Sequence, residues 1–152
     1  LDPQLQLQCK VGSYGYESIN FLKKNFVQSW DDYLWVNPDQ TIRECATSNV
    51  FALLKNGEWI TPSTQNCYNG ATRQHFICWL QEKGQKITQE SINLNKLSKI
   101  ECLIFTNAVQ IMGLIELPTL PIIEDRVKDR IQKIRSHFFL DMLTKTDGKL
   151  EL

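Results

Sequence analysis

The Asn56-Gly57 pair restricts the fold of this chain more than any other feature of its sequence. Both residues tolerate the positive φ that a tight hairpin turn requires, and apolar runs flank them at residues 50–54 and 59–60. The spacing therefore predicts a β-hairpin, which the Thr61-Pro62 pair ends.

The apolar pattern on both sides of this hairpin alternates between strand and helix spacing. Strands are expected at residues 5–11, 33–36, 41–42, 86–88, 102–105 and 109–117. Helices are expected at residues 14–28, between Gly70 and Gly84, at residues 94–97, and from Ile123 onward. Short strands and helices mixed with local hairpins predict an α+β domain rather than a doubly wound parallel sheet.

The last predicted helix has a clear apolar face. Charged residues such as Glu124 and Arg130 lie outside this face, so we expect one side of the helix in a core and the other in solvent. The expected buried stripe comprises Ile123, Val127, Ile131, Ile134 and Phe138.

Composition and charge limit the classes of protein to which the chain can belong. Its 152 residues are 42% hydrophobic, which suits one domain with one core. Seventeen basic and seventeen acidic residues cancel, so the charge indicates no nucleic-acid partner. No apolar run reaches membrane-spanning length and no signal peptide opens the sequence, so we expect a cytoplasmic protein without a membrane partner.

The five cysteines are odd in number, scattered, and never in a Cys-x-x-Cys pair, which favours reduced, buried thiols over a disulfide framework. The two histidines, His75 and His137, show no ligand spacing, so no metal site is expected.

Four short motifs follow one another along the chain. They are ECATSNVF at residues 44–51, the Thr61-Pro62 pair, GATR at residues 70–73 and FTNA at residues 105–108. This succession resembles the class IV aminotransferase family of fold type IV enzymes, which includes branched-chain and D-amino-acid aminotransferases and aminodeoxychorismate lyases. The resemblance covers roughly residues 8–115 and implies the D-amino-acid aminotransferase-like fold, with mixed sheets, flanking helices and pyridoxal 5'-phosphate (PLP) as cofactor.

Lys10 stands upstream of Glu44, where the family places the lysine that forms a Schiff base with PLP. Such a lysine must lose its proton before it attacks an aldehyde, and burial near cationic groups promotes that loss. The alternative is a surface lysine at a strand end. Many relatives carry a tyrosine after the lysine, and here Gly15 occupies that position, between Tyr14 and Tyr16.

The resemblance places Glu44 beneath the pyridine nitrogen of PLP. A carboxylate there keeps the nitrogen protonated, so that the ring can take up the electrons of a substrate carbanion. The alternative is an exposed strand glutamate that pairs with Arg43 or with solvent. Asn49, in the same motif, is also expected among the cofactor-binding residues.

Two loops are expected to bind the cofactor phosphate. The residues that follow Gly70 open a helix whose unsatisfied N–H groups suit a phosphate, and in the family this contact falls to the positions of Ala71 and Thr72. The alternative is an ordinary helix start. The resemblance also implies a phosphate contact for Asn107 and a contact between Ala108 and the substrate carboxylate.

Three activities remain open. Asparagine at position 107 is more typical of aminodeoxychorismate lyases than of branched-chain enzymes. It favours a lyase that converts 4-amino-4-deoxychorismate into 4-aminobenzoate and pyruvate for folate biosynthesis. The alternatives are an aminotransferase for branched-chain or D-amino acids, and an inactive truncated chain that acts as a binding or dimerisation module, since an open site excludes water poorly.

The resemblance also implies the domain organisation. Residues 1–122 are expected to form the PLP-binding domain, which is the C-terminal domain of the family, and residues 123–152 a terminal helix packed on it. The family's N-terminal small domain is expected to be absent from this chain. A small-molecule amino substrate and a homodimer are the expected partners.

Overall fold

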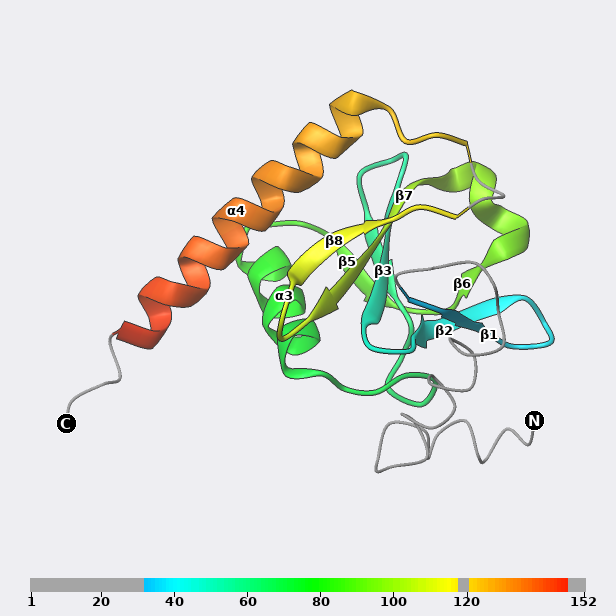
Figure 1. Ribbon diagram of the computed structural model, residues 1–152, viewed down its shortest axis with the longest axis horizontal. Coiled ribbons are helices and arrows are strands. Elements are labelled where there is room, and N and C mark those ends of the chain that lie inside the picture. Colours follow the sequence, from blue (N-terminus) through cyan, green and yellow to red (C-terminus); the bar gives the residue numbers. More distant parts are fainter. Residues whose placement is uncertain (1–31, 118–120, 148–152) are drawn as a thin grey trace.

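The computed structural model describes residues 32–117 and 121–147, and three layers make up this part of the chain (Figure 1). A five-stranded sheet lies between two α-helices on one face and a three-stranded sheet on the other. The arrangement confirms the mixed α+β fold that the sequence predicts. The elements expected at residues 5–11 and 14–28, like Lys10, lie outside the described residues.

The central sheet has the strand order β5-β4-β3-β7-β8. Strands β4 and β5 pair in parallel, and the other three pairs are antiparallel. Strand β3 pairs with β7 from Asn49 opposite Thr106 to Leu54 opposite Ile100. The five strands are β3 (Asn49–Leu54), β4 (Trp59–Thr61), β5 (Ile87–Gln89), β7 (Ile100–Asn107) and β8 (Ile111–Ile115).

The predicted hairpin joins β3 to β4. Gly57 has a φ of 88°, in the left-handed region that residues with a side chain rarely adopt. Its N–H donates to the Leu54 carbonyl oxygen at 2.8 Å, and the Glu58 N–H donates to the side-chain oxygen of Asn56 at 3.0 Å. The predicted hairpin is therefore confirmed, but Gly57 alone of the Asn-Gly pair has a positive φ, and Lys55 and Asn56 are the central residues of the turn.

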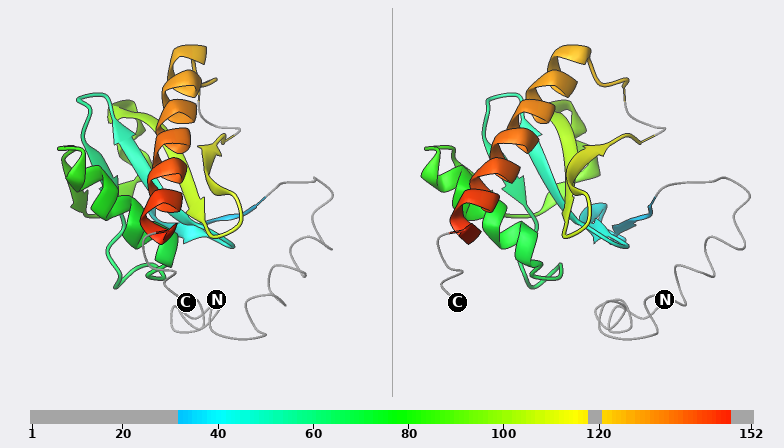
Figure 2. Two further views of the ribbon diagram at one scale, coloured as in Figure 1. Left: turned by 90° about the vertical axis from the view of Figure 1, so that its left-hand side faces the viewer. Right: turned by 60° about the vertical axis from the view of Figure 1, so that its left-hand side comes forward.

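Helices α3 (Ala71–Glu82) and α4 (Asp125–Asp147) cover the same face of the central sheet (Figure 2). The ring centroid of Phe76 in α3 lies 5.1 Å from that of Phe51 in β3 and 5.1 Å from that of Phe138 in α4. The predicted stripe faces this core, since Val127, Ile131 and Phe138 of α4 are buried and Ile134 is partly buried, as is Ile123, which lies just before the helix.

The end of α3 lies where the sequence indicates. Gly84 has a φ of 69°, and its N–H donates to the Gln81 carbonyl oxygen at 3.0 Å. The Gln85 N–H reaches back to the Leu80 carbonyl oxygen at 2.8 Å. These bonds satisfy carbonyl groups that the last turn leaves without helical partners.

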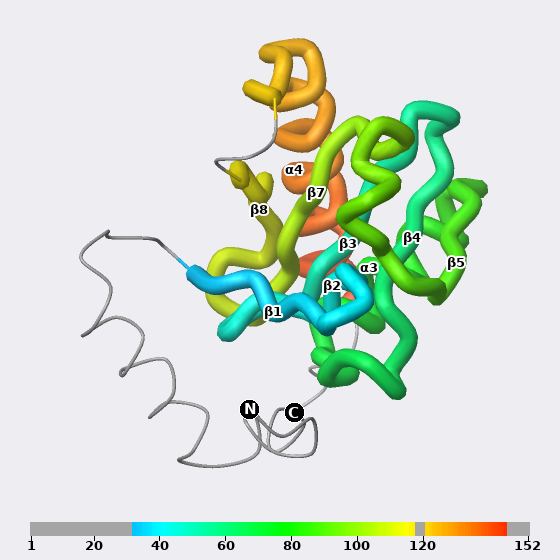
Figure 3. The backbone as a smooth tube through the Cα atoms, turned by 90° about the vertical axis from the view of Figure 1, so that its right-hand side faces the viewer, coloured from blue at the N-terminus to red at the C-terminus, as the bar shows by residue number. Residues whose placement is uncertain are grey.

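A second sheet, of order β1-β2-β6, covers the other face of β3 and β7 (Figure 3). Ile42 of this sheet packs in one core with Val50 of β3 and Leu103 of β7, so alternate residues of β3 enter separate cores. Its strands are β1 (Leu34–Val36), β2 (Thr41–Cys45) and β6 (Ile92–Asn93), and a 3-10 helix (Leu94–Lys99) follows them.

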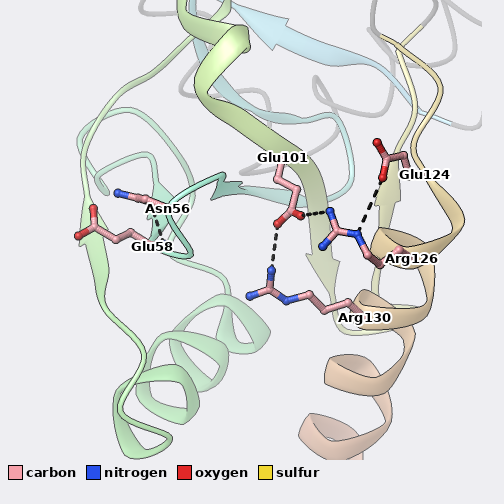
Figure 4. A network of polar contacts seen from close by, with 6 residues as sticks. All are labelled: Asn56, Glu58, Glu101, Glu124, Arg126 and Arg130. Carbon is pink, nitrogen blue, oxygen red and sulfur yellow. Dashed lines mark hydrogen bonds and ion pairs between the residues drawn. The ribbon is translucent and has the colours of Figure 1, made fainter.

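Two arginines connect the start of α4 to β7 (Figure 4). Arg130 Nη1 lies 3.0 Å from one carboxylate oxygen of Glu101, and Arg126 Nη2 lies 3.4 Å from the other. Glu124 lies 3.9 Å from Arg126. Because the arginines are largely in solvent, these pairs orient the helix and contribute little to its stability.

Three of the four described cysteines are buried. Burial raises the pKa of the Cys102 thiol to about 12, well above its ordinary value. Cys78 is exposed, which corrects the expectation of buried thiols, because it lies on the outer face of α3 between Ile77 and Trp79. Within residues 32–117 and 121–147 no helix has the length and hydropathy to cross a membrane.

Replacing Phe138 should destabilise the protein much more than replacing its neighbour Phe139. Phe138→Ala removes a ring that is 1% exposed and should lower the free energy of unfolding by about 3–5 kcal/mol. Phe139→Ala truncates a ring that is 42% exposed and should change it by roughly 0.5 kcal/mol or less. Urea denaturation measures both, and equal losses would contradict the packing of α4.

The contact between α3 and α4 should make stability depend on pH. The Trp79 indole donates to Asp141 Oδ2 at 2.8 Å, and Lys83 Nζ lies 2.8 Å from the same oxygen. The hydrogen bonds from Lys83 and then Trp79 hold the pKa of the Asp141 carboxyl below its ordinary 3.8. The carboxylate therefore stabilises the fold fully above that value, and this contribution disappears as the pH falls through the lowered pKa.

Asp141→Asn should flatten the acid limb of a plot of unfolding free energy against pH. Asp129→Asn is the matched control, since Asp129 is an exposed residue of the same helix. An acid limb that Asp141→Asn leaves as steep as in the wild type would exclude this role.

Candidate functional site

The predicted site residues that the structure describes gather at one end of the central sheet. Asn49 begins β3, Asn107 ends β7, and Ala108 follows it in the loop to β8. Glu44 lies near the end of β2, and its carboxylate contacts the loop that leads into α3. Lys10 lies outside the described residues, so its relation to this group stays a prediction.

Glu44 is buried and is held by donors of its surroundings. Its Oε2 accepts the Tyr68 backbone N–H at 2.9 Å and faces the Asn49 side-chain amide at 3.4 Å. The side chain is therefore not the exposed strand glutamate that was the alternative. A buried carboxylate fixed by a backbone N–H has a defined direction in which it can accept a proton-bearing group.

Asn49 connects this carboxylate to the start of α3. Its amide Nδ2 donates to the Tyr68 carbonyl oxygen at 2.6 Å. Its Oδ1 lies only 2.5 Å from the position that a Cβ on Gly70 would occupy. A side chain at position 70 would collide with this amide, so the close approach explains why glycine precedes the helix. Asn49 is 4% exposed, and its role is to hold Glu44 and Tyr68 in place.

The start of α3 is open to an anion. Gly70 is the N-cap residue, no side chain of the described residues caps the helix, and its first turn contains no acidic residue. Backbone N–H groups in a first turn have no helical acceptor and carry partial positive charge. Ala71 is exposed and Thr72 is buried, so the predicted phosphate-binding pair begins at the surface and continues inward.

Asn107 shapes the loop between β7 and β8. Its Oδ1 accepts the backbone N–H groups of Val109 at 3.0 Å and Gln110 at 2.7 Å, and its Nδ2 donates to Ser48 Oγ at 3.0 Å. The side chain thus joins the end of β7 to the start of β3. Ala108 is exposed within this loop.

Three further residues of the site were not predicted from the sequence. Tyr68 holds Glu44 and Asn49 through its backbone, so its side-chain type carries no signal. Ser48 accepts the amide of Asn107. Thr106 lies opposite Asn49 and is 1% exposed, yet its Oγ1 has no hydrogen-bond partner among the described residues. In the sequence, only the position of Thr106 beside Asn107 in the FTNA motif indicated that Thr106 belongs to the site.

The described residues contain no group of three or more His, Cys, Asp and Glu side chains that could hold a metal ion. The site offers other chemistry: the buried carboxylate of Glu44, the start of α3 without a side-chain cap among the described residues, and Gly70 packed closely against Asn49. This combination suits an elongated ligand with a phosphate at one end and a proton-bearing nitrogen at the other.

Comparisons with known proteins agree with this description. A family profile described as amino-transferase class IV matches residues 2–116. A curated relative, a probable branched-chain-amino-acid aminotransferase from Rickettsia felis, is 26% identical over 132 residues, which cover 84% of this chain and 45% of the relative.

Solved structures share the fold. A putative 4-amino-4-deoxychorismate lyase from Legionella pneumophila aligns with a TM-score of 0.67 at 18% identity, over 82% of this chain and 47% of that one. An aminotransferase from Brucella abortus bound to PLP aligns with a TM-score of 0.63 at 19% identity, over 85% and 45%. The chain therefore spans about half the length of these relatives.

The contact between Gly70 and Asn49 can be tested by a double-mutant cycle. Gly70→Ala should lower the free energy of unfolding by about 1–3 kcal/mol, because the new Cβ collides with Asn49 Oδ1. Asn49→Ala removes that oxygen, so in its background the cost of Gly70→Ala should fall by about half or more. Urea denaturation of the four proteins gives the coupling, and simple additivity would exclude the contact.

Proposed function

This chain belongs to the class IV aminotransferase family, and we propose that it is the PLP-binding half of an enzyme of that family, with Lys10 as the covalent attachment point. Two features together carry the proposal: the Glu44 carboxylate, which Tyr68 N–H fixes, and the start of α3, which no described side chain caps. The domain ranges expected from the sequence, 1–122 and 123–152, are part of this proposal.

The residues present fit PLP by their chemistry. The close contact of Asn49 with Gly70 leaves room only for glycine before α3, so backbone N–H groups rather than a side chain face the ligand there. The buried Thr106 hydroxyl, which has no partner among the described residues, adds a free hydrogen-bonding group at the same end of the sheet. Bound PLP supplies an electron-accepting ring.

Each residue then has a role in binding or proton transfer. Glu44 would accept a hydrogen bond from the pyridinium N–H and so keep the ring nitrogen protonated, because Tyr68 N–H and the Asn49 amide hold its carboxylate. The N–H groups of Ala71 and Thr72, with the loop of Asn107, hold the phosphate. Ala108 offers its N–H to the substrate carboxylate. Lys10 moves the proton on the substrate carbon.

For the reaction we propose a lyase of the aminodeoxychorismate type, which releases 4-aminobenzoate and pyruvate. Asn107 supports this choice, because the resemblance implies asparagine at this position in the lyases of the family. Its amide also orders the loop to β8. The fold likeness to the Legionella pneumophila protein is compatible with it. A homodimer, a cytoplasmic location and a role in folate biosynthesis belong to the same proposal.

An aminotransferase is the second candidate. The curated relatives that match are probable branched-chain-amino-acid aminotransferases, at 26% and 25% identity. Lys10, Glu44 and the phosphate loops serve both reactions, so the choice between them depends on the substrate pocket. A third candidate is a chain that binds or dimerises without catalysis.

Cofactor binding is the first test. The 152-residue chain incubated with PLP and passed through a desalting column should keep a visible absorbance band. Borohydride should then fix the cofactor on the peptide that contains Lys10, as mass spectrometry detects. Lys10→Ala should abolish this attachment, and Lys55→Ala, at the far hairpin, should not. A wild-type chain that retains no PLP would overturn the proposed function.

Substrate turnover then separates the candidates. Release of 4-aminobenzoate and pyruvate from 4-amino-4-deoxychorismate would establish the lyase. Transfer of an amino group from leucine or a D-amino acid to 2-oxoglutarate would establish an aminotransferase instead. PLP binding without either reaction would favour the non-catalytic candidate for this chain.

A further inference from the structure

Arg73 is a buried charge without a carboxylate partner among the described residues. It stands in the first turn of α3 and is 1% exposed. Its Nη1 donates to Asn69 Oδ1 at 3.0 Å, and its Nη2 donates to the Pro62 carbonyl oxygen at 2.8 Å and to Gln89 Oε1 at 2.9 Å. Its Nε has no acceptor in the described part of the chain.

These acceptors are neutral, so they do not offset the positive charge of the Arg73 guanidinium. Buried arginines are normally paired with a carboxylate, because removing an ion from water is costly. A guanidinium stays protonated at all relevant pH values, so Arg73 cannot avoid this cost by losing its proton. The buried carboxylate of the site, Glu44, contacts the Tyr68 N–H and the Asn49 amide. Within the described part of the chain, no carboxylate therefore compensates the positive charge of Arg73.

The Arg73 guanidinium lies next to the start of α3. Asn69, which accepts from Arg73, is the residue before the N-cap Gly70. A positive charge in a region of low dielectric acts over a longer distance than one in water, and it adds to the partial charge of the first-turn N–H groups. The buried Thr106 hydroxyl opposite Asn49, which has no partner among the described residues, is a second, independent observation that points to a ligand at this end of the sheet.

We propose that Arg73 is a positioning residue whose buried charge, acting through the start of α3, sets the affinity of the site for a phosphate monoester dianion. Arg73 does not touch the phosphate, because its fork is engaged by Asn69, Pro62 and Gln89. The bound dianion serves as its counter-charge. This inference rests on the proposed function, which supplies the phosphate as part of PLP, and free phosphate shares the same chemistry.

Gln89→Glu is the sharpest test, since it changes the charge and keeps the shape. It places a carboxylate where Gln89 Oε1 now accepts from Arg73 Nη2 at 2.9 Å, so that it neutralises the guanidinium without removing it. We expect the affinity for inorganic phosphate and for PLP to fall by about tenfold. Gln81→Glu adds the same charge on an exposed position of α3, at the opposite end, and should change neither affinity.

Two arginine variants separate charge from hydrogen bonding. Arg73→Gln removes the charge and should weaken phosphate binding by about tenfold, whereas Arg73→Lys keeps it and should stay within about threefold of wild type. Pyridoxal, which lacks the phosphate, should bind all variants as it binds wild type. Titrations followed by the amide NMR signals of Ala71 and Thr72 measure these affinities and report whether the helix start is intact.

The outcomes distinguish this inference from the proposed function. If the wild type binds neither PLP nor phosphate, the proposed function fails. If the wild type binds both and Gln89→Glu binds them equally well, the role of Arg73 fails while the function stands. A loss of pyridoxal binding that equals the loss of PLP binding, or an Arg73→Lys variant as weak as Arg73→Gln, would show that Arg73 is structural only.

Discussion

Burial of strand β3 on both faces is the constraint on which the rest of the structure depends. Val50, Phe51, Ala52 and Leu53 have no accessible surface, and they alternate between the helix-covered core and the core of the three-stranded sheet. A shift of one residue in the pairing with β7 would exchange the two sets and place Phe51 where Ala52 now fits. Close packing penalises such an exchange, so the register is fixed.

This register places the site. With Asn49 opposite Thr106, the end of the buried strand pair brings Asn49 and Asn107 to the same edge as the start of α3. Around that edge the contacts are polar and short: Tyr68 N–H holds Glu44, Asn49 holds the Tyr68 carbonyl and Ser48 accepts from Asn107. The apolar core thus supplies rigidity, and the polar groups at its end supply directed hydrogen bonds, which is the division that a binding site requires.

The sequence predicted those parts of the fold that local chemistry determines. The Asn56-Gly57 turn, the glycine end of α3 and the stripe of α4 each follow from residues close together in the chain. The motif order also led to Glu44 and Asn49, whose side chains contact one another, and to Asn107, whose amide donates to Ser48 beside Asn49, while their roles toward a cofactor stay a prediction. Sequence could not reveal that Tyr68 acts through its backbone or that Arg73 lacks a carboxylate partner among the described residues. These facts depend on which distant segments meet, and no local pattern encodes them.

The length of β7 separates the hairpin of Gly57 from the site. Residues 55–57 lie beside the start of β7 and Asn107 lies at its end, and eight strand residues span roughly 25 Å. Loops of this kind accept extra residues when their backbone is exposed and away from the core. Lys55 and Asn56 are exposed, so this hairpin is a suitable place for an inserted tag or a fused reporter domain. A label carried there would leave the proposed binding site at the other end of the sheet accessible for binding studies.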